Sequence, residues 1–335
     1  MIERRYYGSS GLNLPVLGIV CWAYGGCASD YWGAQDQEDV DAVVSRALDA
    51  GINYFDTAEA YNEGRSEEAL GQALQGHRQQ AIIGTKVLPG FTEPATLRQH
   101  CEASLKRLNT DYIDIYMVHW PIVDLPVEDA FATLAALQAE GKIKTIGVSN
   151  FGVHQLQEAL STGVKIEVNQ LCYNLLSRGI EIDLMPFCAS QKIGILAYSP
   201  LAQGLLTGKF RSADEMPPAR TRTRHFRGDR PGSRHGEAGA EEEVFAAVEG
   251  LRQVALELQA PPAQVALAWC LGRPEITCVL PGIRTAGQLA ENEAGAQLKL
   301  SPGIMARLND LTLALREKLG SSQDYYQNRD DPRTR

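Results

Sequence analysis

Short apolar stretches of strand length recur along the chain, and segments with helical spacing of apolar residues separate most of them. The stretches are 15–20, 52–55, 81–85, 112–118, 143–148, 165–168, 193–198 and 276–280. Each has the length of a buried strand. Eight strand-then-helix units predict an α/β fold, a single (β/α)8 TIM barrel over residues 1–335. The alternative is an open doubly wound sheet, but the sequence lacks the GxGxxG loop that usually follows the first strand of a dinucleotide-binding sheet.

Two short patterns predict where helices begin. Thr92 with Pro94 has the residue types that open a helix, since a hydroxyl caps the first turn and proline fits its first position. Ser66 followed by Glu67 and Glu68 places a capping hydroxyl before two acids, which the helix dipole favours in the first turn.

Three segments fall outside the strand-and-helix alternation. Two extended stretches around Ser9-Ser10-Gly11 predict a hairpin that caps the N-terminal end of the barrel. Residues 211–240, which follow the seventh strand, combine turn formers with seven arginines. This long loop is expected to be either a solvated insertion or a mobile flap over an anionic ligand on the cofactor side. The tail, residues 319–335, is polar and expected to be poorly ordered.

Composition narrows the function classes. The net charge of −9 disfavours nonspecific binding to nucleic acid or an anionic membrane. No apolar run approaches the ~18 residues of a membrane-spanning helix, and the first residues lack the apolar core of a signal peptide. The seven cysteines form no CxxC pair, and no spacing resembles a metal site. A reduced, cytoplasmic protein without a metal is therefore expected.

Polar residues stand at the ends of the predicted strands. Asp56 follows the second strand, Lys86 the third and His119 the fourth, and Tyr61 lies five residues beyond Asp56. Ser149 and Asn150 follow the fifth strand, Asn169 and Gln170 the sixth, and Tyr198 and Ser199 end the seventh. The carboxyl ends of barrel strands converge on one site. Asp56, Tyr61, Lys86 and His119, called the quartet below, are therefore expected to lie together at the barrel mouth.

The quartet suits proton delivery to an oxygen. A tyrosine hydroxyl has an ordinary pKa of about 10, and a neighbouring lysine ammonium favours the phenolate and lowers that pKa. An aspartate paired with the lysine would hold it charged, and a histidine could donate a hydrogen bond to a carbonyl oxygen. The sequence shows no activated serine or cysteine nucleophile. A hydride from a bound nicotinamide would complete the reaction.

The chain resembles the aldo-keto reductase family over nearly its whole length. The resemblance rests on FDTAEAY (55–61), GTKV (84–87), VHWP (118–121), GVSNF (147–151), the segment of Gln170, Tyr173 and Asn174, AYSPLAQGLLTGKF (197–210) and LPGIRTAGQLAEN (280–292). These motifs occur in family order. The resemblance implies a (β/α)8 barrel that uses NADPH without a Rossmann domain. It also implies that Tyr61 is the general acid, that Lys86 and Asp56 tune it, and that His119 orients the carbonyl.

The same resemblance implies a cofactor site. Ser149, Asn150 and Gln170 would hold the nicotinamide carboxamide, and Tyr198 would stack on the ring. Residues 199–208 would cover the pyrophosphate, with contacts from Ser199, Pro200, Leu201, Gln203 and Gly204. On the adenosine side the implied residues are Gly282, Arg284, Gln288, Glu291 and Asn292. Because a guanidinium suits a dianionic phosphate, Arg284 favours NADP(H), with NAD(H) as the alternative.

Near the first strand the chain departs from the family pattern. Many members have GTW or GTM where this chain has Val20-Cys21-Trp22, so Cys21 and Trp22 are expected to meet the nicotinamide ribose differently. Trp22, Tyr24, Tyr31, Trp32 and Trp120 are expected to form an aromatic wall around the substrate.

The expected activity is hydride transfer between NADP(H) and an aldehyde or ketone, or the reverse alcohol oxidation. One alternative is a nicotinamide-binding regulatory subunit, since potassium-channel β subunits also resemble this family. The short N-terminus argues against it, because it offers no inactivating segment. The other alternative is an NAD-preferring sugar or polyol dehydrogenase. The substrate and the oligomeric state are not readable from the sequence.

Overall fold

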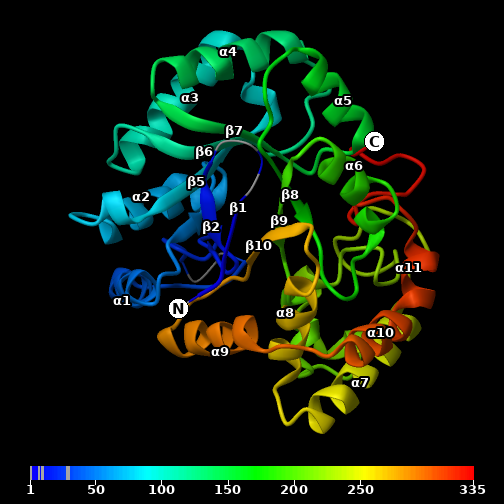
Figure 1. Ribbon diagram of the computed structural model, residues 1–335. Helices are drawn as coiled ribbons and strands as arrows, with labels where there is room; N and C mark the ends of the chain where they lie inside the picture. Colours follow the sequence, from blue (N-terminus) through cyan, green and yellow to red (C-terminus); the bar gives the residue numbers. More distant parts are fainter. Residues whose placement is uncertain (1, 7, 9–10, 28–30) are drawn as a thin grey trace.

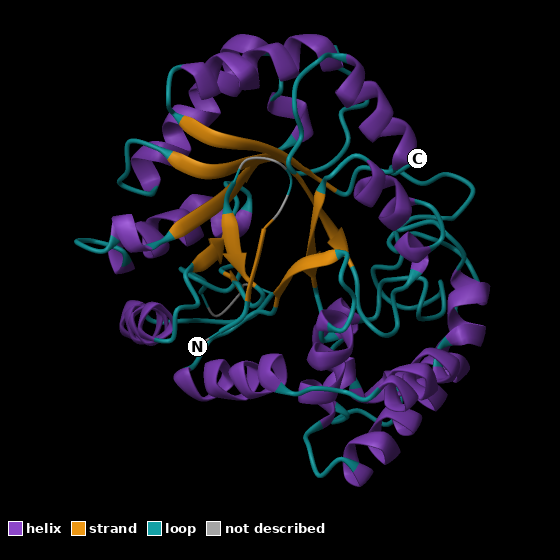
Figure 2. Cartoon of the chain, in the orientation of Figure 1, coloured by secondary structure: helices purple, strands orange, loops and turns teal. Residues whose placement is uncertain are grey.

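The computed structural model describes residues 2–6, 8, 11–27 and 31–335. Eight parallel strands form a ring in the middle of the molecule, and helices surround it (Figure 1, Figure 2). The strands are β3 (Ile19–Val20), β4 (Tyr54–Asp56), β5 (Ile82–Val87), β6 (Ile113–Val118), β7 (Ile143–Ser149), β8 (Val168–Cys172), β9 (Gly194–Tyr198) and β10 (Ile276–Leu280). They pair in sequence order from β3 to β10. The predicted (β/α)8 barrel is confirmed.

Backbone contacts close the ring between its first and last strands. Leu17 bridges Val279 and Val20 bridges Gly282, both in parallel orientation. The Val20 amide donates to the Pro281 carbonyl at 3.0 Å. Because the strands are parallel, all eight carboxyl ends lie at one face, and closure gathers them around one mouth, where polar side chains from distant motifs can meet.

The helices cover the outside of the barrel with their apolar faces inward. They are α1 (Gln37–Asp49), α2 (Arg65–Ala73), α3 (Pro94–Arg107), α4 (Val127–Ala139), α5 (Val153–Ser161), α6 (Leu184–Ser190), α7 (Glu241–Glu257), α8 (Pro262–Leu271), α9 (Ala286–Gln297), α10 (Pro302–Leu311) and α11 (Leu313–Leu319). In α1 the buried residues are Val40, Val43, Val44 and Ala47. Their three- and four-residue spacing is that of a single helical face.

An N-terminal hairpin packs on the barrel interior. Strands β1 (Arg4–Tyr6) and β2 (Asn13–Pro15) pair antiparallel, which confirms the predicted hairpin, although Ser9 and Ser10 lie outside the described residues. Leu14 is fully buried among inward-facing residues of the strands, including Ile115 and Met117. The hairpin thereby closes one end of the barrel. The other end, where the carboxyl ends of the strands lie, remains available for a functional site.

Three local predictions need correction. Helix α3 begins at Pro94, as predicted, but its cap is Glu93 and not Thr92: the Glu93 carboxylate accepts from the Thr96 amide at 3.1 Å. Helix α2 has Glu67 and Glu68 in its first turn, as predicted, but it follows Gly64, and Ser66 lies inside that turn, where its hydroxyl donates to the Cys21 carbonyl at 2.6 Å. The sixth barrel strand covers 168–172 instead of 165–168, so Asn169 and Gln170 are strand residues.

The long loop 211–240 and the tail pack against each other. Arg224 is fully buried, and its guanidinium donates to the carbonyls of Leu319 and Ser322 at 2.8 and 2.6 Å. In the tail, Asp324 and Tyr325 are buried. The expectation of a poorly ordered tail is therefore wrong: its polar groups find partners in distant loops. The loop is anchored at Arg224, while other parts of it, such as 217–219, are exposed.

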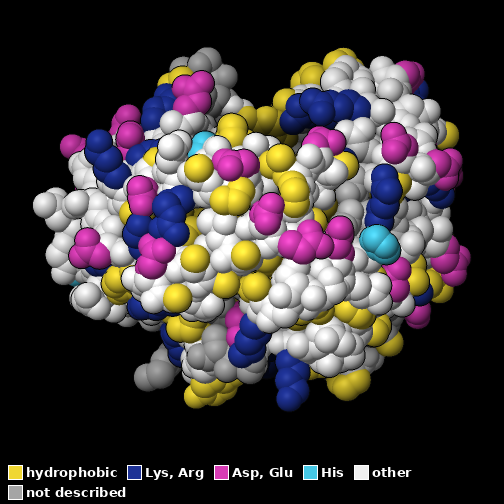
Figure 3. All heavy atoms as spheres, turned by 90° about the horizontal axis from the view of Figure 1, so that it is seen from above, with side chains coloured by type: hydrophobic (Ala, Val, Ile, Leu, Met, Phe, Trp, Pro, Cys, Tyr) yellow, Lys and Arg dark blue, Asp and Glu magenta, His cyan; other side chains and the backbone are white. Residues whose placement is uncertain are grey.

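The outer surface carries mixed charge. Side chains of both signs are scattered over the face seen in Figure 3. Within the described residues, the structure contains no helix both long and apolar enough to cross a membrane.

Candidate active site

The quartet comes together at the carboxyl ends of β4, β5 and β6. The Lys86 ammonium donates to Asp56 Oδ2 at 2.7 Å, to the Thr57 carbonyl at 2.7 Å and to the Tyr61 hydroxyl at 3.4 Å. The side chains of Lys86 and Asp56 are both fully buried. Lys86 is the penultimate residue of β5, one position before the strand ends. A single buried cation thus joins the carboxylate to the phenol.

His119 stands beside the phenol. Its ring and that of Tyr61 meet edge to face with centroids 5.8 Å apart. Burial, with the Lys86 charge, lowers the pKa of His119 to about 3. Its buried Nδ1 has no hydrogen-bond partner among the described residues. A neutral imidazole here can give a hydrogen bond to a substrate oxygen without carrying a charge of its own.

The pKa of Tyr61 differs from the sequence expectation. Burial raises it above the ordinary value for tyrosine, and the Lys86 ammonium only partly opposes that rise. The expected net lowering is therefore wrong in this structure. For Lys86, burial alone would lower the pKa, but Asp56 and Tyr61 outweigh it and the pKa is raised. Both directions favour a protonated phenol next to a charged ammonium.

Three residues assigned to the nicotinamide carboxamide form a network with the quartet. Gln170 Nε2 donates to Asp56 Oδ1 at 2.6 Å. The Ser149 hydroxyl donates to the Gln170 carbonyl at 3.0 Å, and Asn150 Nδ2 donates to the His119 carbonyl at 3.1 Å. Tyr198, the last residue of β9, donates to Asn150 Oδ1 at 2.8 Å. Gln170 therefore also positions Asp56, a role that its motif did not reveal.

The loop after β9, expected to cover the pyrophosphate, is tightly turned. Ser199, Ala202 and Gln203 have positive φ, as does Gly204. The Ser199 carbonyl accepts from Asn174 Nδ2 at 3.0 Å, a support that the motif alone does not show. Pro200 and Leu201 lie within this turn. Strained, tightly turned backbone of this kind is typical of a ligand-binding loop.

The adenosine-side residues gather around the start of α9, yet Arg284 is already engaged. Its Nη1 donates to the Trp32 carbonyl at 2.8 Å and its Nη2 to the Ala34 carbonyl. The Arg284 amide donates to Gln288 Oε1 at 2.8 Å. Gly282, Gln288 and Glu291 are exposed, whereas Asn292 is buried. The guanidinium thus holds the β3–α1 loop, which sequence spacing could not show.

The proposed aromatic wall is only partly present. Trp22 stacks on Tyr31 and on Tyr61 with centroids 5.2 and 5.8 Å apart, and Trp32 meets both Trp22 and Tyr31 edge-on. The prediction that Tyr24 belongs to this wall is wrong, because its side chain is fully buried in the core and cannot face a substrate. Trp120 lies beneath the guanidinium of Arg333, 3.7 Å from the ring centroid.

Cys21 is fully buried, and burial raises the pKa of its thiol well above its ordinary value. This favours packing over any reactive role. Within the described ranges, no group of histidine, cysteine and acidic side chains could hold a metal ion.

Two partners of the site, Thr57 and Tyr326, and one contact of Tyr31 were missed from the sequence. The Thr57 carbonyl binds Lys86. Tyr31 donates to Gln203 Oε1 at 2.9 Å, which links the β3–α1 loop to the loop after β9. Tyr326 of the tail accepts from Gln203 Nε2 at 3.0 Å. Tyr326 and Arg333 bring the tail to the mouth, and no sequence signal could have found them because they match no motif.

Comparison with known proteins agrees with this geometry. The model of the Aldo/keto reductase family matches residues 22–312. The chain is 34% identical to the Aldo-keto reductase YhdN of Bacillus subtilis over 86% of this chain and 87% of that protein. It is 31% identical to the NADH-specific methylglyoxal reductase of Escherichia coli, with coverage of 92% and 98%.

Two further similarities point to different roles within the same fold. A probable voltage-gated potassium channel subunit beta of Arabidopsis thaliana is 29% identical over 87% of this chain and 90% of that protein. The structure is similar to an aldo-keto reductase from Klebsiella pneumoniae in complex with NADPH, with a TM-score of 0.74, 28% identity, and coverage of 93% and 95%. On the strength of the family match and the barrel, this chain belongs to the aldo/keto reductase family of oxidoreductases.

Proposed function

We propose that the protein is an NADP(H)-dependent carbonyl reductase. It would transfer a hydride between NADP(H) and an aldehyde or ketone, or run the reverse reaction on the alcohol. The observation that carries the proposal is the contact of one buried ammonium, that of Lys86, with both the Asp56 carboxylate and the Tyr61 hydroxyl. Such an arrangement stabilises a phenolate as it forms, which is what a tyrosine proton donor needs.

In this proposal each quartet residue has one role. His119 donates a hydrogen bond to the carbonyl oxygen and orients it. The carbonyl carbon would gain the hydride that bound NADPH would supply, and the carbonyl oxygen would take the proton from Tyr61. Lys86 stabilises the resulting phenolate, and Asp56, itself held by Gln170, keeps the ammonium in place. Solvent then returns a proton to Tyr61.

The described residues fit a nicotinamide dinucleotide. We assign Ser149, Asn150 and Gln170 to the carboxamide, Tyr198 to the ring face, and Cys21 and Trp22 to the ribose side, where the burial of Cys21 limits its part to backbone contact. Ser199, Pro200, Leu201, Gln203 and Gly204 would hold the pyrophosphate, and Gly282, Arg284, Gln288, Glu291 and Asn292 the adenosine end. The open space beside Gly282, where a Cβ would meet nothing within 4 Å, supports this placement.

The preference for NADP(H) over NAD(H) depends on Arg284. The Trp32 and Ala34 carbonyls take only two of the five N–H donors of its guanidinium, and its Nε has no partner among the described residues. The remaining donors suit a dianionic 2′-phosphate, which is a strong acceptor. Arg284→Ala should weaken NADPH binding by about tenfold or more, because a charge-assisted contact with the 2′-phosphate is lost. It should weaken NADH binding much less. Titration of intrinsic fluorescence with each cofactor measures both. Equal effects on the two cofactors would favour NAD(H), as in the NADH-specific relative.

The test of the function is NADPH consumption with a carbonyl panel: glyceraldehyde, methylglyoxal, a nitrobenzaldehyde, pentanal, 4-oxobutanoate and a simple ketone, with NADH in parallel. Turnover that requires Tyr61 supports the reductase. Tight cofactor binding without turnover of any carbonyl would instead favour a regulatory subunit, the second candidate, which the similarity to a plant potassium-channel β subunit supports.

A further inference from the structure

The tail approaches the barrel mouth where two loops carry glycine. A Cβ on Gly152, between β7 and α5, would fall 2.1 Å from the Arg335 carbonyl oxygen. A Cβ on Gly179, after β8, would fall 2.9 Å from the carbonyl oxygen of Gly320. Neither glycine has positive φ, so their backbones do not require glycine. The missing side chains of the two glycines leave space for the tail backbone, which indicates that these loops accommodate a docked tail.

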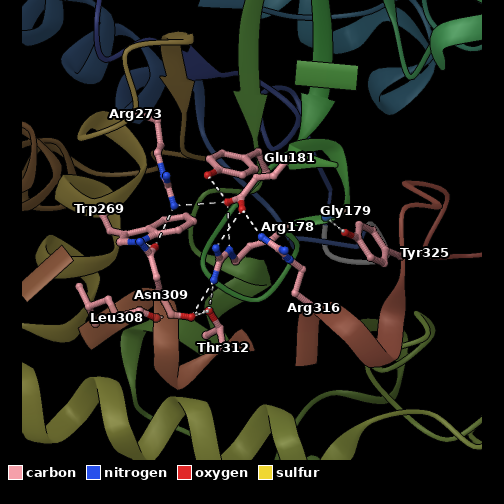
Figure 4. Close-up of polar contacts among 11 residues, drawn as sticks. Arg178, Gly179, Glu181, Trp269, Arg273, Leu308, Asn309, Thr312, Arg316 and Tyr325 are labelled. Atoms are coloured by element: carbon pink, nitrogen blue, oxygen red, sulfur yellow. Dashed lines mark hydrogen bonds and ion pairs between the residues drawn. The ribbon is translucent and has the colours of Figure 1, made fainter. Parts of the chain in front are cut away.

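Side-chain contacts fix the loop that carries Gly179. The Glu181 carboxylate pairs with Arg178, Arg273 and Arg316 at 2.9, 3.6 and 3.1 Å, and it accepts from the Tyr173 hydroxyl at 2.7 Å (Figure 4). The Gly179 amide donates to the hydroxyl of Tyr325, a tail residue, at 3.1 Å (Figure 4). The loop that binds the tail is therefore itself held in place by the ion pairs and the hydrogen bond of Glu181.

One arginine of this docked tail stacks on Trp120, a residue expected to face the substrate. Asp324, whose side chain is fully buried, accepts from Arg333 Nε at 2.7 Å and from Nη2 at 2.8 Å. The guanidinium lies 3.7 Å from the centroid of Trp120, the residue that follows His119. The Arg333 side chain remains 39% exposed. Its Nη1 makes no hydrogen bond with any part of the chain that the structure describes.

The contacts of Arg333 with Asp324 and Trp120 fix the orientation of its guanidinium, which packing of the tail alone does not require. An arginine held along one edge by a carboxylate and across its face by an aromatic ring is preorganised, so little conformational entropy is lost when it binds a ligand. Its free N–H groups still suit a carboxylate or phosphate. Lys86, whose charge acts on His119, is fully buried and paired with Asp56, whereas Arg333 beside Trp120 is partly exposed.

We propose that Arg333, fixed by Asp324 on Trp120, is a specificity-determining residue that binds an anionic group on the carbonyl substrate. The favoured substrate class is then short aldehydes or ketones that bear a carboxylate. The inference rests on the proposed reductase function, because it names the substrate class of the same site.

The test compares 4-oxobutanoate with pentanal, an uncharged aldehyde of similar length, in the full chain with NADPH. For Arg333→Met, the ratio of kcat/KM for 4-oxobutanoate to that for pentanal should fall by about tenfold or more, the loss of a charge-assisted hydrogen bond. The fall should come through KM, because the contact is equal in the ground and transition states. Arg329→Met is the matched control: this tail arginine pairs with Glu237 at 2.7 Å, and its variant should keep the ratio.

A second readout does not depend on turnover. Succinate should quench tryptophan fluorescence in the wild type, because Trp120 stacks on the binding group, and its affinity should fall about tenfold in Arg333→Met. Because that variant leaves the buried Asp324 carboxylate unpaired, the double variant with Asp324→Asn is measured beside it.

The outcomes separate the two proposals. An unchanged substrate ratio and unchanged succinate affinity, or a wild type that reduces pentanal but not 4-oxobutanoate, would overturn the role of Arg333. Failure to reduce any carbonyl of the panel would defeat the reductase function itself.

Discussion

Two carboxylate–cation pairs at the barrel mouth share a contact distance and differ in burial. Lys86–Asp56 and Arg333–Asp324 each have an N–O distance of 2.7 Å. Both side chains of the first pair are fully buried, whereas Arg333 in the second is 39% exposed. In the first pair the charge can act only on its neighbours, which suits the proposed role in proton transfer. In the second an edge of the cation faces outward, so it can meet a ligand. Burial, not distance, separates the two roles.

Removing the buried cation should have the largest effect. Lys86→Met is expected to lower kcat by roughly 10²–10⁴-fold, because nothing then stabilises the Tyr61 phenolate. It should also lower the free energy of unfolding by about 3–5 kcal/mol, because Asp56 is left buried and unpaired. Steady-state kinetics and urea unfolding measure the two effects. The double variant with Asp56→Asn should regain stability but not activity, and full activity in Lys86→Met would refute its role.

The pH dependence of stability should report the environment of His119. Its folded-state pKa is about 3, below the unfolded value of about 6.5. Between these values the unfolded chain binds the extra proton, so His119 makes the protein lose stability as pH falls from about 6.5 toward 3. The slope is at most about 1.4 kcal/mol per pH unit for this one proton. Urea unfolding across this range should show a shallower slope in His119→Asn. Identical slopes would contradict the buried, neutral imidazole.

A smaller effect should follow from filling the space that the tail occupies. Gly152→Ala would place a Cβ 2.1 Å from the Arg335 carbonyl oxygen and should cost about 1–3 kcal/mol, as overpacking does. Hydrogen exchange of 319–335 should become faster. Gly303→Ala is the control, since its nearest atom would be 4.0 Å away and its φ is not positive. Unchanged exchange in Gly152→Ala would show that the tail does not need this close approach.

The two pairs also differ in how far the sequence could predict them. Asp56, Tyr61, Lys86 and His119 lie at the ends of neighbouring parallel strands, so the alternation of strands and helices was enough to bring them together. The pairing of Arg333 with Trp120 depends on how a polar tail crosses the mouth, and local patterns carry no such information. The same is true of Arg284, whose partners Trp32 and Ala34 are about 250 residues away.

Two errors in the prediction have a common physical cause. Tyr24 was expected to face a substrate but is buried, and the pKa of Tyr61 was expected to fall but rises through burial. Residue type and spacing predict which groups meet. They do not predict how completely the surrounding side chains exclude water, and that exclusion decides both cases.

The most direct test of the central claim is the single-turnover rate of NADPH oxidation in Tyr61→Phe, with cofactor and carbonyl both saturating. The variant keeps the ring that stacks on Trp22 and removes only the hydroxyl. We predict a loss of roughly 10²–10⁴-fold in rate, the usual contribution of a general acid, with NADPH affinity nearly unchanged. A rate close to that of the wild type would contradict the assignment of Tyr61 as proton donor, and with it the account of the quartet.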